Sequence, residues 1–201
     1  MTNKPIKSIA VAGAGGIGSN LVSIMYDYGV NRNQFDFLGC KIDVYDDDIV
    51  EMSNLLHQNF SEDDIHTMKV QSLAKRYAIT PVERFMTEAD FPKYDLIFSA
   101  VDSMTFRKAL YNWSWNNPDK GFWIDGRCES RTGSVFNKTN KKEMLEKMID
   151  DSEQRAGCLL AFEKEQKTSH TTPIVVAATM FQTFLNYNRG VSSLPEKIFM
   201  L

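Results

Sequence analysis

Short apolar runs alternate, over the first two thirds of the chain, with segments whose apolar residues recur every three or four positions. Side chains alternate between the two faces of a strand and repeat every third or fourth residue on a helix, so the runs predict strands and the periodic segments predict helices. Strands are predicted at 8–12, 41–45, 82–86, 94–100, 121–125 and 133–136, and helices at 17–28, 68–77, 104–113, 141–149 and 173–187. This alternation indicates βαβ units, and hence an α/β fold: a Rossmann-like, mostly parallel sheet with helices on both faces.

The pattern changes beyond Gly126. Residues 154–172 are polar and without a clear period, which predicts a linker. The segment 173–187 is apolar, with Pro173 at its predicted first turn and Gly190 just past its end. Because proline suits the first turn of a helix and glycine suits its end, this segment predicts a buried helix that closes the fold as a C-terminal extension.

Composition narrows the class of protein. With 201 residues, 43% of them hydrophobic, the chain is long enough for a real core and short enough for one domain. A net charge of -3 gives no overall basic field for nucleic acid or an anionic membrane. No apolar stretch approaches the length of a membrane span, and three widely spaced cysteines without a C-x-x-C motif suggest neither a disulfide framework nor structural zinc. We expect a soluble cytoplasmic protein with no nucleic-acid or membrane partner.

A glycine loop follows the first predicted strand. VAGAGGIGSN places Gly13, Gly15 and Gly18 in the pattern G-x-G-x-x-G, with Gly16 between them, directly before a predicted helix. The first glycine permits a tight turn, the second lets backbone approach a phosphate, and the third lets helix and strand pack closely. The helix N-terminus offers N–H groups and a positive dipole end to an anion. The loop therefore predicts a nucleotide site, and the alternative is a glycine turn in a fold that binds nothing.

Acidic residues follow the second predicted strand. Dinucleotide enzymes usually carry one acidic residue here, about 20 residues past the loop, to hold a ribose. In this chain Asp43 and the run Asp46–Asp48 come somewhat later and supply more carboxylates than a ribose needs. An NAD(P)- or FAD-dependent oxidoreductase stays open on the glycine loop alone, although no Tyr-x-x-x-Lys pair supports it.

Four motifs in order carry a family resemblance. GAGGIGS at 13–19, DDDIVEMSNLLHQ at 46–58, Lys69, and AVDSMTFR at 100–107 together resemble the ThiF and MoeB family, the adenylating relatives of ubiquitin-activating enzymes. The closing segment 173–190 is similar to the last core helix of that family. The resemblance implies one ThiF-like adenylation domain over residues 1–201, a crossover loop before the closing helix, and a homodimer.

The resemblance also implies that the nucleotide is ATP. Asp46 would hold the ribose hydroxyls, and Asp48 would support the loop beside it. Asn54 and Gln58 would approach the phosphates or their metal, and Lys69 would neutralise phosphate charge in the transition state. The competing interpretations are that Asp46–Asp48 form a solvated acidic turn and that Lys69 is an ordinary surface lysine.

On the same grounds, Asp102 would coordinate the Mg²⁺ bound to ATP, with Arg107 one helical turn further as support. Magnesium takes one or two carboxylates together with phosphate oxygens, and ligands of parallel sheets gather at the carboxyl ends of strands, where Asp102 is predicted to lie. The competing interpretation makes Asp102 only the N-cap of a helix.

Three features depart from the family or stay open. His57 stands where the family has arginine, and histidine near neutral pH is only partly protonated, which would weaken catalysis or make it pH-dependent. Arg127 and Arg131 would compensate for the missing arginine of the family, or would be solvated loop residues. Cys158 would form a thioester in the crossover region, or would be a half-buried structural thiol.

The function implied is an ATP-dependent adenylyltransferase that activates the C-terminal carboxylate of a ubiquitin-like or sulfur-carrier protein, or of a peptide. A non-catalytic nucleotide-binding scaffold of the same fold remains the alternative, because of His57 and because little chain precedes the first strand to supply the arginine of the family's N-terminal segment.

Overall fold

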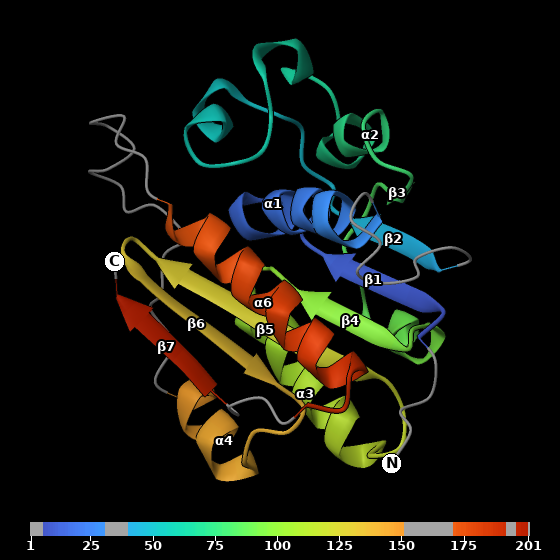
Figure 1. The fold of residues 1–201 in the computed structure, drawn as a ribbon, viewed down its shortest axis with the longest axis vertical. Helices are drawn as coiled ribbons and strands as arrows, with labels where there is room; N and C mark the ends of the chain where they lie inside the picture. The colour runs from blue at the N-terminus through green and yellow to red at the C-terminus, as the bar shows by residue number, and fades with distance from the viewer. Residues whose placement is uncertain (1–5, 31–39, 151–170, 192–195, 201) are drawn as a thin grey trace.

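The computed structural model of the protein describes residues 6–30, 40–150, 171–191 and 196–200 (Figure 1). These residues form a seven-stranded sheet in the order β3-β2-β1-β4-β5-β6-β7. β3 through β5 in that order pair in parallel, and β6 and β7 are antiparallel. The strands are β1 (Ser8–Ala12), β2 (Lys41–Tyr45), β3 (Thr80–Val82), β4 (Leu96–Ser99), β5 (Phe122–Glu129), β6 (Thr132–Asn137) and β7 (Glu196–Met200). The predicted mostly parallel sheet is confirmed.

The central strands are apolar along their whole length because both faces of the sheet are covered. In β1, Ile9 and Val11 join the hydrophobic cluster on one face, and Ala10 and Ala12 join the cluster on the other. Ile9 pairs in register with Ile42 of β2 and with Leu96 of β4. The parallel register brings the carboxyl ends of β1, β2 and β4 to one edge, where the loops after them meet.

Helices cover the two faces. The cluster containing Ile9 includes buried side chains of α1, α2 and α6, whereas the cluster containing Ala10 includes side chains of α3 and α4 (Figure 1). The α-helices are α1 (Gly16–Ile24), α2 (Lys69–Ala74), α3 (Met104–Asn116), α4 (Lys142–Asp150) and α6 (Thr172–Asn188). Gly126 lets α6 lie close to β5, since an added Cβ would come within 2.3 Å of Met180 Sδ. No helix in the described ranges combines the length and the apolar character that a membrane crossing requires.

Short helical turns connect these elements. η1 is a π-helical turn that continues α1 in place of its predicted last turn, and η2, η3 and η4 are 3₁₀ helices in the connections before α2 and β4. Their bounds are η1 (Met25–Val30), η2 (Met52–Leu56), η3 (Glu62–Asp64) and η4 (Glu88–Lys93).

Two strand predictions need correction. The third strand forms at Thr80–Val82 and not at 82–86, because its pairing with β2 ends at Val82, and Phe85 beyond it is 66% exposed. The last strand, β7, was not predicted at all. Residues 196–200 form this strand by pairing antiparallel with β6. Most of the predicted linker at 154–172 lies outside the described residues.

Candidate functional site

A cavity of about 730 Å³ lies at the carboxyl ends of the parallel strands. This volume falls in the range of small-molecule sites, and this edge of an open α/β sheet is where such sites occur. Its wall combines the segments that follow β1, β2, β3 and β4 with the last residues of β5. They contribute Gly13, Gly15 and Gly16 after β1, Asp46 and Asp48 after β2, Phe85 to Glu88 after β3, Ala100 to Arg107 after β4, and Arg127 to Glu129 at the end of β5.

The glycine loop has the geometry expected from its sequence at two positions. Gly13 has a φ of 92°, and an added Cβ would lie 2.7 Å from the carbonyl oxygen of Ala100. At Gly18 an added Cβ would lie 1.8 Å from the carbonyl oxygen of Gly13, so helix and strand can pack only without a side chain there. Gly15, in contrast, has nothing within 4 Å of an added Cβ. It is the N-cap of α1 and provides no side-chain cap, which leaves the first N–H groups of the helix for a ligand.

Asp46 fastens this loop to the end of β2. Its Oδ2 accepts a hydrogen bond from the backbone N–H of Ala14 at 2.6 Å, and its Oδ1 accepts one from the N–H of Asp48 at 2.9 Å. The residue is 8% exposed, and burial raises the pKa of its carboxyl against the lowering effect of those hydrogen bonds and of Lys69. Asp46 is therefore a fixed part of the wall and not a solvated turn residue, whereas Asp47 and Asp48 are exposed.

Lys69, the first residue of α2, is brought to the same place. Its side chain is 7% exposed, and its Nζ donates to Asp48 Oδ2 at 2.7 Å. Both residues line the cavity. The interpretation of Lys69 as an ordinary surface lysine is therefore wrong, although its ion pair reaches a carboxylate that is 64% exposed and so adds little to stability.

The polar cluster after β2 divides between two places. His57 and Gln58 line the cavity. The His57 ring lies against the start of α1, since an added Cβ on Gly16 would be 3.2 Å from its Cδ2. Asn54 is not part of the cavity wall; its Oδ1 accepts from the N–H of Glu51 at 2.9 Å and caps η2. The amide oxygen of Gln58 is buried and has no hydrogen-bond partner in the described part of the chain.

Asp102 follows β4 on the cavity wall and is exposed. The N-cap of α3 is Ser103, whose Oγ accepts from the N–H of Phe106 at 3.2 Å, so Asp102 is not the helix cap. An exposed carboxylate on this wall fits the oxygen ligands that Mg²⁺ prefers. Among the residues described, Asp46, Asp47 and Asp48 also form a group whose ligand oxygens lie within 4.8 Å of one another.

Asp125, in β5, is the centre of a buried ionic network that the sequence did not predict. One of its oxygens accepts from Ser99 Oγ at 2.6 Å and from Arg107 Nε at 3.0 Å. The other accepts from Tyr111 OH at 2.7 Å and from Arg127 Nε at 2.8 Å. Asp125 is fully buried; burial raises the pKa of its carboxyl, but the two guanidinium groups lower it to about 2.

Arg127 corrects an interpretation made from the sequence. We placed it in a loop, as a compensating or solvated arginine, but β5 extends to Glu129 and Arg127 is 7% exposed within it. The alternation of Asp125 and Arg127 on one strand was the available signal, since residues two apart share a face. Arg131 does lie exposed in the turn between β5 and β6.

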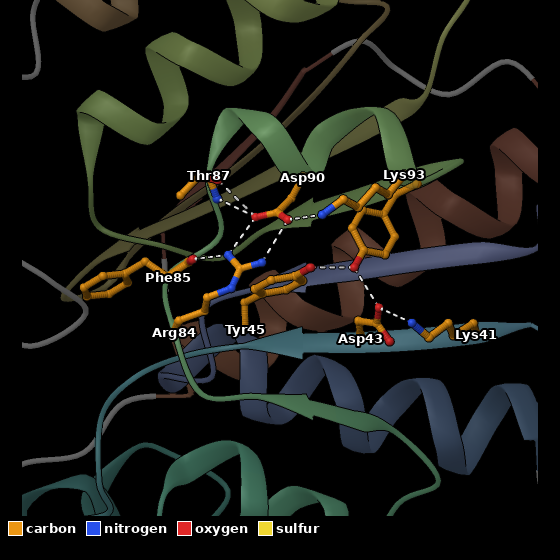
Figure 2. Close-up of polar contacts among 9 residues, drawn as sticks. Lys41, Asp43, Tyr45, Arg84, Phe85, Thr87, Asp90 and Lys93 are labelled. Carbon is orange, nitrogen blue, oxygen red and sulfur yellow. Dashed lines mark hydrogen bonds and ion pairs between the residues drawn. The ribbon is translucent and has the colours of Figure 1, made fainter.

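A second ionic cluster holds the wall after β3 (Figure 2). Arg84 donates to both carboxylate oxygens of Asp90, at 2.8 and 2.9 Å, and to the carbonyl oxygen of Phe85. Lys93 Nζ and the backbone and side chain of Thr87 complete the shell of Asp90. These hydrogen bonds, that of Arg84 first, hold the pKa of Asp90 well below its usual range. The cluster fixes the segment from Phe85 to Glu88, which lines the cavity.

Asp43 belongs to this side of the sheet and not to the cavity (Figure 2). It accepts from Lys41 Nζ at 2.8 Å and from Tyr94 OH at 2.7 Å. The Tyr94 hydroxyl in turn lies 2.6 Å from that of Tyr45. Asp46, and not Asp43, is therefore the carboxylate that the second strand presents to the glycine loop.

The predicted thioester candidate, Cys158, lies outside the described residues. Cys128 lies on the cavity wall at the end of β5 and is disulfide-bonded, which the cysteine spacing did not predict.

Comparisons with known proteins agree with this architecture. In solved structures, the fold is similar to that of MccB from E. coli bound to MccA-N7isoASN, with a TM-score of 0.65, 16% identity, and coverage of 97% of this chain and 61% of that one. The structure of E. coli MccB with ATP has a TM-score of 0.62 and 18% identity, with coverage of 97% of this chain and 60% of that one. A third similar structure is that of the E. coli tRNA N6-threonylcarbamoyladenosine dehydratase TcdA in complex with AMP. Its TM-score is 0.62 and its identity 16%, with coverage of 92% of this chain and 86% of that one. The chain thus spans about 61% of the length of the MccB chain.

A search of curated proteins by sequence found no match. The sequence profile of the ThiF family matches residues 6–197, which is nearly the whole chain and contains all four motifs from the glycine loop to Arg107. The protein therefore belongs to the ThiF family.

Proposed function

We propose that this protein binds ATP with Mg²⁺ and transfers the adenylyl group to a carboxylate. The observation that carries the proposal is the single cavity wall shared by the glycine loop, Asp46, Lys69 and Asp102. These residues come from four separate stretches of sequence. An oxidoreductase would need a hydride-transfer constellation as well, and nothing in the described part of the wall supplies one.

The order of strands suggests how ATP would lie. Tyr45, Met86 and Phe106 offer apolar surface for a base on the side of β2 and β3. Asp46 would accept from the ribose hydroxyls with the lone pairs that its two backbone hydrogen bonds leave over. The phosphates would meet the N–H groups at the start of α1, where a helix N-terminus favours negative charge.

The chemistry asked of the protein is mainly positioning and charge neutralisation. A carboxylate oxygen attacks the α-phosphorus, the bond to the bridging oxygen breaks, and pyrophosphate leaves. Lys69, held by Asp48, would face the negative charge that develops on the phosphates. Asp102 would hold Mg²⁺, which when bound offsets phosphate charge.

We further propose that the substrate carboxylate is the C-terminus of a small ubiquitin-like or sulfur-carrier protein, or of a peptide, and that the enzyme acts as a cytoplasmic homodimer. Support comes from the family, and from MccB, which is described in complex with MccA as well as with ATP. A carboxyl terminus suits a cavity that opens at the ends of several strands, because an extended chain end can enter it without unfolding.

The test is ATP–pyrophosphate exchange in the presence of Mg²⁺ and candidate carriers, with calorimetric titration of ATP and of NAD in parallel. We expect ATP to bind, NAD to bind more weakly, and exchange to require one carrier. Absence of ATP binding would end the proposal.

A second candidate is a nucleotide-binding scaffold without turnover, which the position of His57 against the start of α1 favours. Histidine presents one donor at a time where the family has a forked, permanently charged arginine. ATP binding without exchange, unimproved by His57→Arg, would support the scaffold. Exchange that rises in His57→Arg would support the enzyme.

A further inference from the structure

The network around Asp125 carries more positive than negative charge. Arg107 and Arg127 both ion-pair with this one buried carboxylate. Tyr111, the other hydrogen-bonding member, is neutral, because burial and Asp125 raise the pKa of its hydroxyl. Two guanidinium groups and one carboxylate leave a surplus of one positive charge. All three charged side chains are at least nine-tenths buried.

A buried surplus charge is costly unless an anion compensates it. The hydrogen bonds of Arg127 are also incomplete. Its Nε and Nη2 donate to Asp125 and Tyr111, and its guanidinium lies 5.2 Å from the ring centre of Phe136. Its Nη1 is buried with no hydrogen-bond partner in the part of the chain that the structure describes.

The surplus lies beside the cavity. Arg107 and Arg127 both contribute to its wall. Ser134 of β6 pairs directly with Arg127 across the antiparallel ladder and also lines the cavity, so the two side chains share a face about 5 Å apart. Glu129 and Asp102 are the acidic residues of the neighbouring wall. In the strand order, this region lies beyond β4 as seen from the glycine loop, at the opposite end of the cavity from the segment after β3.

We propose that this end of the cavity is an oxyanion subsite in which Arg127 supplies the charge that binds the ligand. The inference rests on the proposed function and deepens it. The reaction offers two oxyanions, the carboxylate of the acyl substrate and the α-phosphate of the nucleotide. A guanidinium recognises both, because the planar carboxylate and the tetrahedral phosphate each present two oxygens that can accept hydrogen bonds from its N–H groups.

Calorimetric titration of the full chain with four probes separates the two sources. Adenosine and AMP differ by the phosphate, and N-acetylglycylglycine and its C-terminal amide differ by the carboxylate charge. The peptide probes are titrated into protein saturated with adenosine. Binding of adenosine and AMP to the unaltered protein tests the proposed nucleotide site by itself, so its failure is distinguishable from failure of the subsite.

The first variant is Arg127→Gln. We expect at least a tenfold loss of affinity for AMP or for the peptide carboxylate, with adenosine affinity within twofold of the unaltered protein. A loss confined to AMP assigns the subsite to the α-phosphate, and a loss confined to N-acetylglycylglycine assigns it to the acyl substrate. Arg76→Gln is the matched control, since Arg76 also pairs with an aspartate but is not on the cavity wall; it should change none of the four affinities.

Because removal of Arg127 could unfold the chain, a second variant places a compensating charge instead. Ser134→Asp puts a carboxylate directly opposite Arg127, and Ser134→Asn is its isosteric control. We expect Ser134→Asp to keep a thermal unfolding midpoint at or above that of the control and to lose oxyanion affinity at least tenfold. The proposal fails if both variants fold and keep the AMP affinity of the unaltered protein and its preference for N-acetylglycylglycine over the amide.

Discussion

The backbone N–H of Ala14 donates to Asp46 Oδ2 at 2.6 Å, which ties the glycine loop after β1 to the acidic segment after β2. One carboxylate thus fixes the loop and faces the cavity. We expect Asp46→Ala to leave the N–H groups of Ala14 and Asp48 without acceptors, destabilising the fold by about 1–3 kcal/mol and weakening ATP binding. Chemical denaturation and ATP calorimetry measure the two effects. Unchanged ATP affinity in the variant would remove Asp46 from the proposed site.

The glycines of the loop should separate folding from binding. Gly13 has a positive φ and no room for a Cβ, so Gly13→Ala should destabilise the fold by about 1–3 kcal/mol. Gly15 has a negative φ and free space for a Cβ, so Gly15→Ala should change stability by less than about 1 kcal/mol. In the proposed ATP pose, the same methyl group would stand where a phosphate approaches the backbone, and we expect ATP affinity to fall. Urea unfolding with ATP titration tests both; a Gly15→Ala variant that binds ATP normally would place the phosphates elsewhere.

Lys69 should matter more to turnover than to stability. Its ion-pair partner Asp48 is 64% exposed, so Lys69→Met should change the free energy of unfolding only slightly. In the proposed reaction the Lys69 charge faces the negative charge that develops on the phosphates, so its loss should lower pyrophosphate exchange about 100-fold. Lys41→Met is the control, because Lys41 also ion-pairs with an aspartate but is not on the cavity wall. Equal exchange rates in the two variants would remove Lys69 from the reaction.

Asp90 should give the protein part of its acid sensitivity. Its pKa is lowered in the folded state by Arg84 first, against the raising effect of burial, and then by Lys93 and Thr87. A carboxyl with a lowered folded pKa stabilises the fold above its unfolded value, near pH 4, and that contribution is lost as pH falls further toward its folded pKa. We expect Asp90→Asn to be less stable at pH 7 and to lose less stability between about pH 4 and pH 2. Denaturation midpoints across this range measure it; parallel curves for both proteins would contradict the assignment.

Much of the fold could be predicted because its signals are local. The strand 41–45 was predicted with its observed bounds, and the closing helix to within one residue at each end, since apolar periodicity and a proline in the first turn act over a few residues. The third strand was predicted two residues too late because its bounds are set by its pairing with β2, which the local sequence does not reveal. In the same way β7 was missed, because its residues pair with β6 residues that lie 60 to 68 positions earlier in the chain, and such pairing leaves no local signal in the sequence.

For the candidate site, the sequence was enough to recognise the motifs and their order, because the glycine loop, the acidic run, Lys69 and Asp102 each lie at a predicted strand end or helix start. Three features became visible only in the folded chain: Lys69 is buried against Asp48, Asn54 caps η2 away from the cavity, and Arg107 and Arg127 both pair with Asp125. Charge pairing and burial depend on residues that the sheet brings together from distant parts of the sequence, and Arg107 lies beside Asp125 because α3 packs on β5.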